Sequence, residues 1–113
     1  EAINRAISDM LRSNNEYFPT AASIISSVSK YYGVEENALR GESRIKEIAN
    51  ARHIAIYLIR HMTNLSLADI GKEFGKDHTT ALYSVQKIDA QIKNDPALAQ
   101  TIREITTNIN VKK

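Results

Sequence analysis

Cysteine is absent from this chain of 113 residues, and so are long hydrophobic runs. Without cysteine the protein forms neither disulfides nor a thiolate metal site, which suits a reducing compartment. No apolar run approaches the ~20 residues of a membrane-spanning helix, and the chain does not begin with a signal-peptide pattern. We therefore expect one cytoplasmic domain with a single core and no membrane among its partners.

Sequence motifs of known enzymes are missing as well. His53 and His61 are eight residues apart, too far for a zinc pair on one helix, and no His-Glu-x-x-His occurs. No serine lies in a nucleophile-elbow sequence, and no glycine-rich loop is present to cradle a phosphate. We predict that this chain is not an enzyme and holds no metal or cofactor.

Charge of one sign is not in large excess, because 15 basic residues face 13 acidic ones and leave a net charge of +2. This balance is too small to indicate a nucleic-acid partner by itself. Basic side chains nevertheless gather between positions 40 and 60, at Arg40, Arg44, Lys46, Arg52 and Arg60. A solvated helix face explains that cluster equally well when it is considered alone.

Apolar residues recur at helical spacing through most of the chain, and no pair of strands is indicated. We predict an all-α fold, a helix-turn-helix-containing bundle of about six helices, preceded by a linker helix in residues 2–13. Residues 19–113 would form the domain and 1–18 a remnant of a preceding segment. Because the chain starts at Glu1 rather than methionine, we expect it to be part of a longer protein.

Local signals place the ends of two of these helices, and an apolar stripe places a third. Thr20 is the predicted N-cap of the first, and Gly33 ends it as a C′ residue. Asp95 and Pro96 offer an N-cap and a first helical position for the last. A long helix over 46–62 is predicted from apolar residues at Ile48, Ala51, Ala55, Leu58, Ile59 and Met62.

A helix-turn-helix pattern follows that long helix. Ser66 and Asp69 form a predicted capping box for a short helix, in which Gly71 lets another helix come close. Gly75-Lys76 make a tight turn, and Asp77 caps a second amphipathic helix. A short helix, a glycine-containing turn and a longer helix is typical of DNA-binding helix-turn-helix motifs, although an ordinary antiparallel hairpin has the same spacing.

The four residues that begin this second helix suit the edges of bases. We call Asp77, His78, Thr79 and Thr80 the reading segment. Imidazole and hydroxyl groups bond to bases, and the threonine methyl packs on the thymine methyl. Asp77 can accept from the cytosine amino group or serve only as an N-cap, and both roles stay open.

Two features upstream suit a phosphate backbone. Arg52 and Arg60 are eight residues apart on the long helix, about 12 Å of rise, which we interpret as one cationic face. The amino end of the short helix, at Leu67 and Ala68, presents free N–H groups and a helix dipole to an anion.

The chain resembles the C-terminal duplex-DNA-binding domain (domain IV) of DnaA, the bacterial chromosomal replication initiator. The matching stretches are Arg44, Ala51-Arg52-His53-Ile54-Ala55-Ile56-Tyr57-Leu58, Thr63-Asn64-Leu65-Ser66-Leu67, Ile70-Gly71 and Asp77-His78-Thr79-Thr80. The resemblance covers roughly residues 19–93, and ordinary helix-turn-helix regulators do not carry this combination. Residues 1–18 would then resemble the end of the ATPase lid and its linker helix.

The resemblance implies sequence-specific binding to DnaA-box repeats at the replication origin, in initiation and regulation of chromosome replication. Arg44 would enter the minor groove, while the reading segment enters the major groove. The residues implied to contact the sugar-phosphate backbone are Lys46, Arg52, His53, Arg60, Thr63, Asn64, Leu67, Ala68 and Lys76. ATP and other initiator subunits would bind domains that this chain lacks, and the protein would be cytoplasmic and nucleoid-associated.

The chain departs from the family at several positions, and two other functions stay open. The Gly75-Lys76 turn is one residue shorter than the family's usual Gly-Gly-Arg, His53 replaces a common glutamine, and Ala81 a common valine. A general helix-turn-helix regulator would bind palindromes as a dimer. A protein-interaction module would use the aromatic residues Tyr17, Phe18, Tyr31 and Tyr32.

Overall fold

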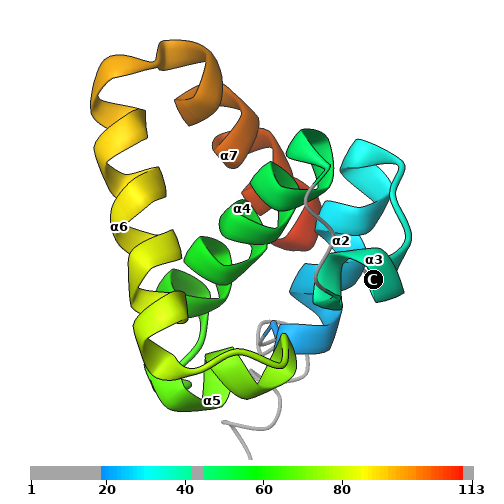
Figure 1. The fold of residues 1–113 in the computed structure, drawn as a ribbon. Helices are drawn as coiled ribbons and strands as arrows, with labels where there is room; N and C mark the ends of the chain where they lie inside the picture. The colour runs from blue at the N-terminus through cyan, green and yellow to red at the C-terminus, as the bar shows by residue number, and fades with distance from the viewer. Residues whose placement is uncertain (1–18, 42–44, 111–113) are drawn as a thin grey trace, which may run out of the picture.

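The computed structural model describes residues 19–41 and 45–110. These ranges hold six helices and no strand: α2 (Ala21–Tyr32), α3 (Glu36–Arg40), α4 (Lys46–Met62), α5 (Leu67–Glu73), α6 (His78–Asn94) and α7 (Pro96–Asn110) (Figure 1). The predicted all-α bundle with a helix-turn-helix is therefore confirmed. The predicted linker helix and Arg44 lie outside the described residues, so the division at residue 18 stays a prediction.

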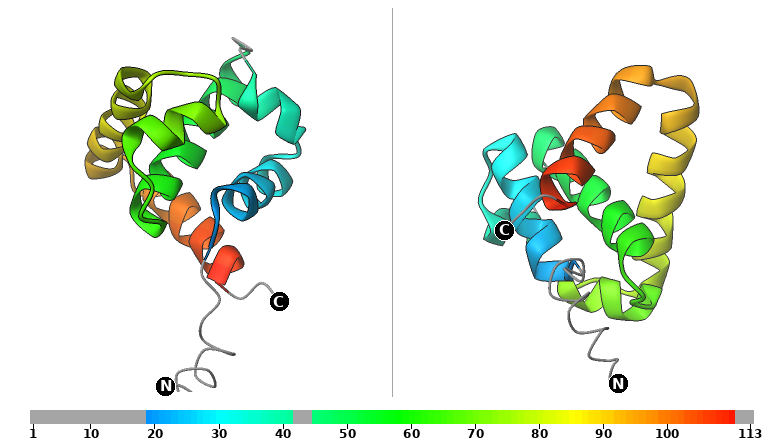
Figure 2. Two further views of the ribbon diagram at one scale, coloured as in Figure 1. Left: turned by 90° about the horizontal axis from the view of Figure 1, so that it is seen from below. Right: turned by 180° about the vertical axis from the view of Figure 1, so that it is seen from behind.

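Helix α4 runs through the middle of the bundle and organises the other helices around it. It contacts α2 and α3 on one side and α5 and α6 on the other. Helix α7 follows α6 and packs against both α6 and α2, so the first and last described helices lie side by side (Figure 2). This arrangement holds α6 against the rest of the domain along one face and leaves its other face to solvent.

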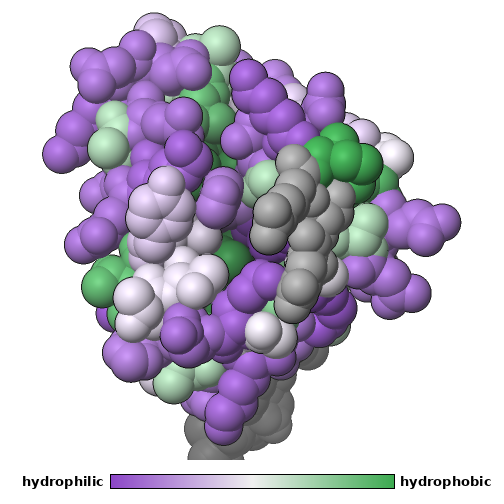
Figure 3. All heavy atoms as spheres, in the orientation of Figure 1, coloured by the Kyte–Doolittle hydropathy of each residue, from purple (hydrophilic) through white to green (hydrophobic). Residues whose placement is uncertain are grey.

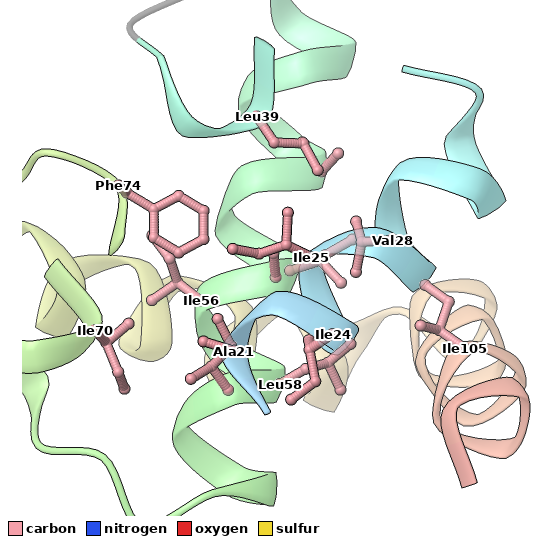
Figure 4. Packing of buried hydrophobic residues seen from close by; sticks show 14 of the residues in the cluster. Ala21, Ile24, Ile25, Val28, Leu39, Ile56, Leu58, Ile70, Phe74 and Ile105 are labelled. Carbon is pink, nitrogen blue, oxygen red and sulfur yellow. The ribbon is translucent and has the colours of Figure 1, made fainter. Parts of the chain in front are cut away.

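The core is mainly aliphatic, includes Phe74, and draws on every described helix. Figure 4 shows side chains of α2, α4 and α5 gathering around the middle of α4. The largest fully buried side chains include Ile24, Ile25, Leu39, Ile56, Ile59, Ile70, Phe74, Ile88, Ile105 and Ile109. Burying one such side chain contributes roughly 1.5–3 kcal/mol, so this cluster fixes the positions of α4, α5 and α6.

The predicted helix ends are confirmed. Thr20 Oγ1 accepts from the Ser23 amide at 3.1 Å, and Ser23 Oγ accepts from the Thr20 amide at 2.9 Å, which completes a capping box. Gly33 ends α2 in the left-handed conformation at φ 68°. Asp95 Oδ1 accepts from the Leu98 amide at 3.1 Å and so caps α7.

The buried face of α6 combines apolar residues with one polar residue. Ala81, Ser84 and Ile88 are the buried residues of this helix, whereas Leu82 is 38% exposed. Leu82 follows Ala81 by one residue, and one step of about 100° turns it away from α4. A polar residue, Ser84, therefore occupies a core position for which the apolar pattern offered no signal.

Candidate nucleic-acid interface

Helices α5 and α6 are joined by a tight turn that Gly71 makes possible. The Gly71 carbonyl accepts from the amides of Phe74, at 2.9 Å, and Lys76, at 2.8 Å. Gly75 adopts the left-handed conformation at φ 66°, which glycine adopts without strain. A side chain on Gly71 would place its Cβ 2.6 Å from the Lys76 carbonyl oxygen. The predicted close approach at Gly71 is thus made by the backbone of the turn, not by another helix.

Asp77 caps the amino end of α6. Its Oδ1 accepts from the Thr80 amide at 2.9 Å, so the predicted N-cap role is confirmed. Hydrogen bonds from the Thr80 amide and hydroxyl lower the pKa of the Asp77 carboxyl below its ordinary value. The carboxylate is therefore ionised at neutral pH and can only accept hydrogen bonds, as a contact to a cytosine amino group requires.

The rest of the reading segment lies on an accessible surface. His78 and Thr79 are exposed and Thr80 is half-buried. One turn further along α6, Tyr83 is 57% exposed, and Thr79, Tyr83 and Lys87 follow each other at intervals of four on one stripe. The face in Figure 3 is largely hydrophilic, with neutral side chains over the amino-terminal part of α6. Tyr83 and Lys87 extend this surface and were not predicted, because their spacing from Thr79 indicates them only once the exposed face of α6 is known.

The prediction that Arg52 and Arg60 share one exposed cationic face is wrong. Arg52 is only 8% exposed. Its Nε donates to the Leu39 carbonyl at 2.8 Å and its Nη2 to the Ala38 carbonyl at 3.3 Å, at the end of α3. Eight residues turn a helix through about 800°, which is about 80° past two full turns and places Arg52 toward α3 rather than in line with Arg60.

The other predicted backbone-contacting side chains lie around the α4–α5 connection and at the start of α4. Arg60 is exposed, with Nη1 3.4 Å from the Leu65 carbonyl. Lys46 and Asn64 are exposed, and Lys76 is half-buried in the turn before α6. Thr63 is engaged within the loop, since its hydroxyl donates to the Ile59 carbonyl at 2.7 Å and accepts from the Leu65 amide at 3.2 Å.

Ser66 caps the amino end of α5. Ser66 Oγ accepts from the Asp69 amide at 3.1 Å, but the return bond of the predicted capping box is not formed among the described residues. The Ile70 amide bonds to the Ser66 carbonyl at 2.9 Å. The amides of Leu67 and Ala68 therefore have no partner within the part of the chain that the structure describes. In Figure 1 the amino ends of α5 and α6 lie on the same side of the molecule.

Two further contacts hold α5 and α6 to the rest of the bundle. Arg40 joins α3 to the end of α5, with Nη1 2.9 Å from Glu73 Oε1 and 3.0 Å from the Glu73 carbonyl oxygen. His53 joins α4 to α6, because its Nδ1 lies 2.7 Å from Ser84 Oγ. Sequence reasoning found neither pair, since each joins residues more than 30 positions apart.

The described residues contain neither a metal-binding cluster nor a membrane-spanning helix. No group of three or more histidine and acidic side chains gathers within them to hold a metal ion. None of their helices is long and apolar enough to cross a membrane. What they do present is the capped, accessible amino end of a helix behind a tight turn.

The fold and the α5–turn–α6 geometry define a helix-turn-helix domain. Residues 21–88 match a family described as the bacterial dnaA protein helix-turn-helix. The chain belongs to this family.

Curated relatives agree with that assignment. The chain is 42% identical over 109 residues to the chromosomal replication initiator protein DnaA of Caldanaerobacter subterraneus subsp. tengcongensis, covering 96% of the chain and 24% of that protein. It is 47% identical over 89 residues to the DnaA of Crocosphaera subtropica, covering 78% of the chain and 20% of that protein. The chain thus spans about a quarter or less of the length of these relatives.

Proposed function

We propose that this domain binds double-stranded DNA at the DnaA-box repeats of a replication origin and so acts in the initiation and regulation of chromosome replication. The observation that carries the proposal is the reading segment. It forms the capped and accessible amino end of the second helix of a helix-turn-helix, in a chain of the DnaA family.

In this proposal α6 enters the major groove with its amino end first. The hydroxyls of Thr79 and Thr80 and the imidazole of His78 bond to base edges, and the Asp77 carboxylate accepts from a cytosine amino group. Arg44, from the segment before α4, enters the minor groove. These base contacts specify the sequence, and contacts to phosphates fix the register of the domain on the duplex.

The proposed phosphate contacts come from two kinds of group. Cationic and polar side chains act from Lys46, Arg60, Asn64 and Lys76, while Thr63 mainly shapes the loop. The unpaired amides of Leu67 and Ala68 act from the backbone, since free N–H groups at a helix start attract anions. Arg52 supports the interface from inside by holding the end of α3, which leads into the segment that carries Arg44.

The roles of the whole protein extend beyond this domain. We assign ATP binding and contacts with other initiator subunits to other parts of the protein, since the chain covers 24% of one DnaA relative. The domain itself performs no catalysis in this proposal, and the protein is located in the cytoplasm at the nucleoid. In this proposal residues 1–18 are the end of the ATPase lid and the linker that leads into the domain.

Chemical-shift mapping of backbone amides during titration with a duplex that carries one DnaA box tests this proposal. We expect the largest changes at 66–68 and 77–87, and little change on α7, which packs against α2 and α6 and passes behind α4 in Figure 1. A scrambled duplex is the control, and its shifts should be smaller and should disappear as salt is raised. Changes centred instead on α2 around Tyr31, which is 39% exposed, or no changes at all, would contradict the proposal.

A further inference from the structure

The pair His53–Ser84 forms a side-chain hydrogen bond between α4 and α6. Ser84 is 1% exposed, and its Oγ lies 2.7 Å from His53 Nδ1. Ser84 belongs to the face of α6 that packs on α4, one turn after Thr80. Any change in this contact therefore acts directly on the helix that carries the reading segment.

The hydrogen bonds available to His53 and Ser84 determine which ring nitrogen of His53 carries the proton. Ser84 Oγ makes no other hydrogen bond within residues 19–41 and 45–110, and a buried hydroxyl proton needs an acceptor. If Nδ1 carried the proton, the Ser84 proton would lack an acceptor. When Ser84 donates to Nδ1, both groups are satisfied and the proton of the neutral ring lies on Nε2.

The surroundings of His53 favour this neutral ring. Partial burial lowers the pKa of His53, and the positive charges of Lys87, on α6, and Arg52, on α4, lower it further. Tyr83 packs edge-on against the imidazole, with ring centroids 6.0 Å apart. Tyr83 and Lys87 are the residues that continue the stripe from Thr79, so His53 borders the exposed surface of α6.

We propose that Ser84 is a positioning residue for DNA recognition: its hydroxyl holds His53 as the Nε2–H tautomer, so that a neutral ring donates to a phosphate beside Tyr83 and Lys87. This inference rests on the proposed DNA-binding function. A phosphate at this position is attracted by the Lys87 ammonium and accepts from Nε2–H. The Ser84–His53 hydrogen bond that orients the Nε2–H donor also holds α6 against α4. The phosphate contact and the placement of the reading segment are therefore coupled.

The tautomer is measured on the free protein by imidazole ¹⁵N chemical shifts, which separate protonated from unprotonated ring nitrogens. We expect the His53 ring of the wild type to be protonated at Nε2 and not at Nδ1 at neutral pH. In Ser84→Ala we expect a mixture of tautomers with an unchanged helical fold. A wild-type ring protonated at Nδ1 would overturn the proposal without any bearing on whether the domain binds DNA.

Binding to a box duplex supplies the second readout. Loss of one neutral hydrogen bond should weaken binding of Ser84→Ala by roughly threefold to tenfold. The side-chain amide of glutamine donates without any choice of tautomer. In a His53→Gln background, adding Ser84→Ala should therefore change affinity for the box duplex by less than about twofold. An equal loss in both backgrounds would show that Ser84 serves packing alone. If the wild type binds a box and a scrambled duplex equally, the proposed DNA-binding function is contradicted, whatever the tautomer of His53.

Discussion

Gly71→Ala is expected to lower the free energy of unfolding by about 2–3 kcal/mol, although alanine is the better helix former. Helix propensity alone predicts a gain of about 1 kcal/mol for this change inside α5. The new Cβ, however, would lie 2.6 Å from the Lys76 carbonyl oxygen and 2.8 Å from that of Asp77. Both contacts are with backbone, which cannot rotate away as a flexible side chain would. Relief therefore requires the turn before α6 to move.

Urea unfolding followed by circular dichroism measures this effect. Lys72→Ala is the matched control, because Lys72 is exposed on the same helix and its substitution should change stability by less than about 0.5 kcal/mol. Displacement of the turn should also weaken binding to the box duplex, since it changes the orientation of α6 relative to α5. An alanine variant as stable as the wild type or more stable would show that the turn tolerates a side chain at Gly71.

Arg52→Met is expected to cost about 2–4 kcal/mol of folding stability. Methionine replaces the aliphatic stem but leaves the Leu39 and Ala38 carbonyls without the guanidinium donors at 2.8 and 3.3 Å. Hydrogen bonds from charged donors contribute about 1.5–3 kcal/mol, and buried acceptors without a partner are costly. The end of α3 should loosen, and with it the segment that leads to Arg44.

Arg60→Met is the control for this change, because Arg60 lies on the same helix but is exposed. It should leave thermal stability nearly unchanged and instead make DNA binding less sensitive to salt, as loss of one phosphate contact does. Thermal unfolding of both variants separates the two arginines. A larger loss of stability from Arg60→Met than from Arg52→Met would contradict the roles assigned to them.

Helix ends and the helix-turn-helix were predictable because their signals are local. Thr20, Asp77 and Asp95 each cap a helix through the amide three residues ahead, so a few neighbouring residues are enough to identify the motif. Gly33 is equally local, because its left-handed conformation depends on the chain next to it. These ends set the lengths of α2, α6 and α7, and hence most of the architecture.

Positions that depend on packing between distant residues were not predictable in this way. The spacing of basic residues predicted Arg52 on an exposed face of α4, but its guanidinium is buried and donates to a carbonyl at the end of α3. Ser84 interrupts the apolar pattern of α6, and its partner His53 lies on another helix, 31 positions away. Leu82 fits an apolar stripe by composition, yet the direction in which α6 packs on α4 leaves it 38% exposed.

The candidate site was predictable in part. The reading segment lies where the helix-turn-helix pattern placed it, and the family match supports its role. Contacts with individual bases and phosphates stay predictions, including that of Arg44, which lies outside the described residues. Tyr83 and Lys87 belong to the same surface, and their four-residue spacing from Thr79 gained meaning only when the exposed face of α6 was known.

Fluorescence anisotropy of two labelled duplexes tests most directly whether α6 reads bases. One duplex carries a DnaA box and the other its scrambled sequence, and both are titrated with wild type and His78→Ala at two salt concentrations. We predict a preference for the box of about a hundredfold or more in the wild type, lost in His78→Ala, with a salt-sensitive background common to both duplexes. Equal binding to both duplexes by the wild type, or a preference unchanged in His78→Ala, would contradict base reading by this helix.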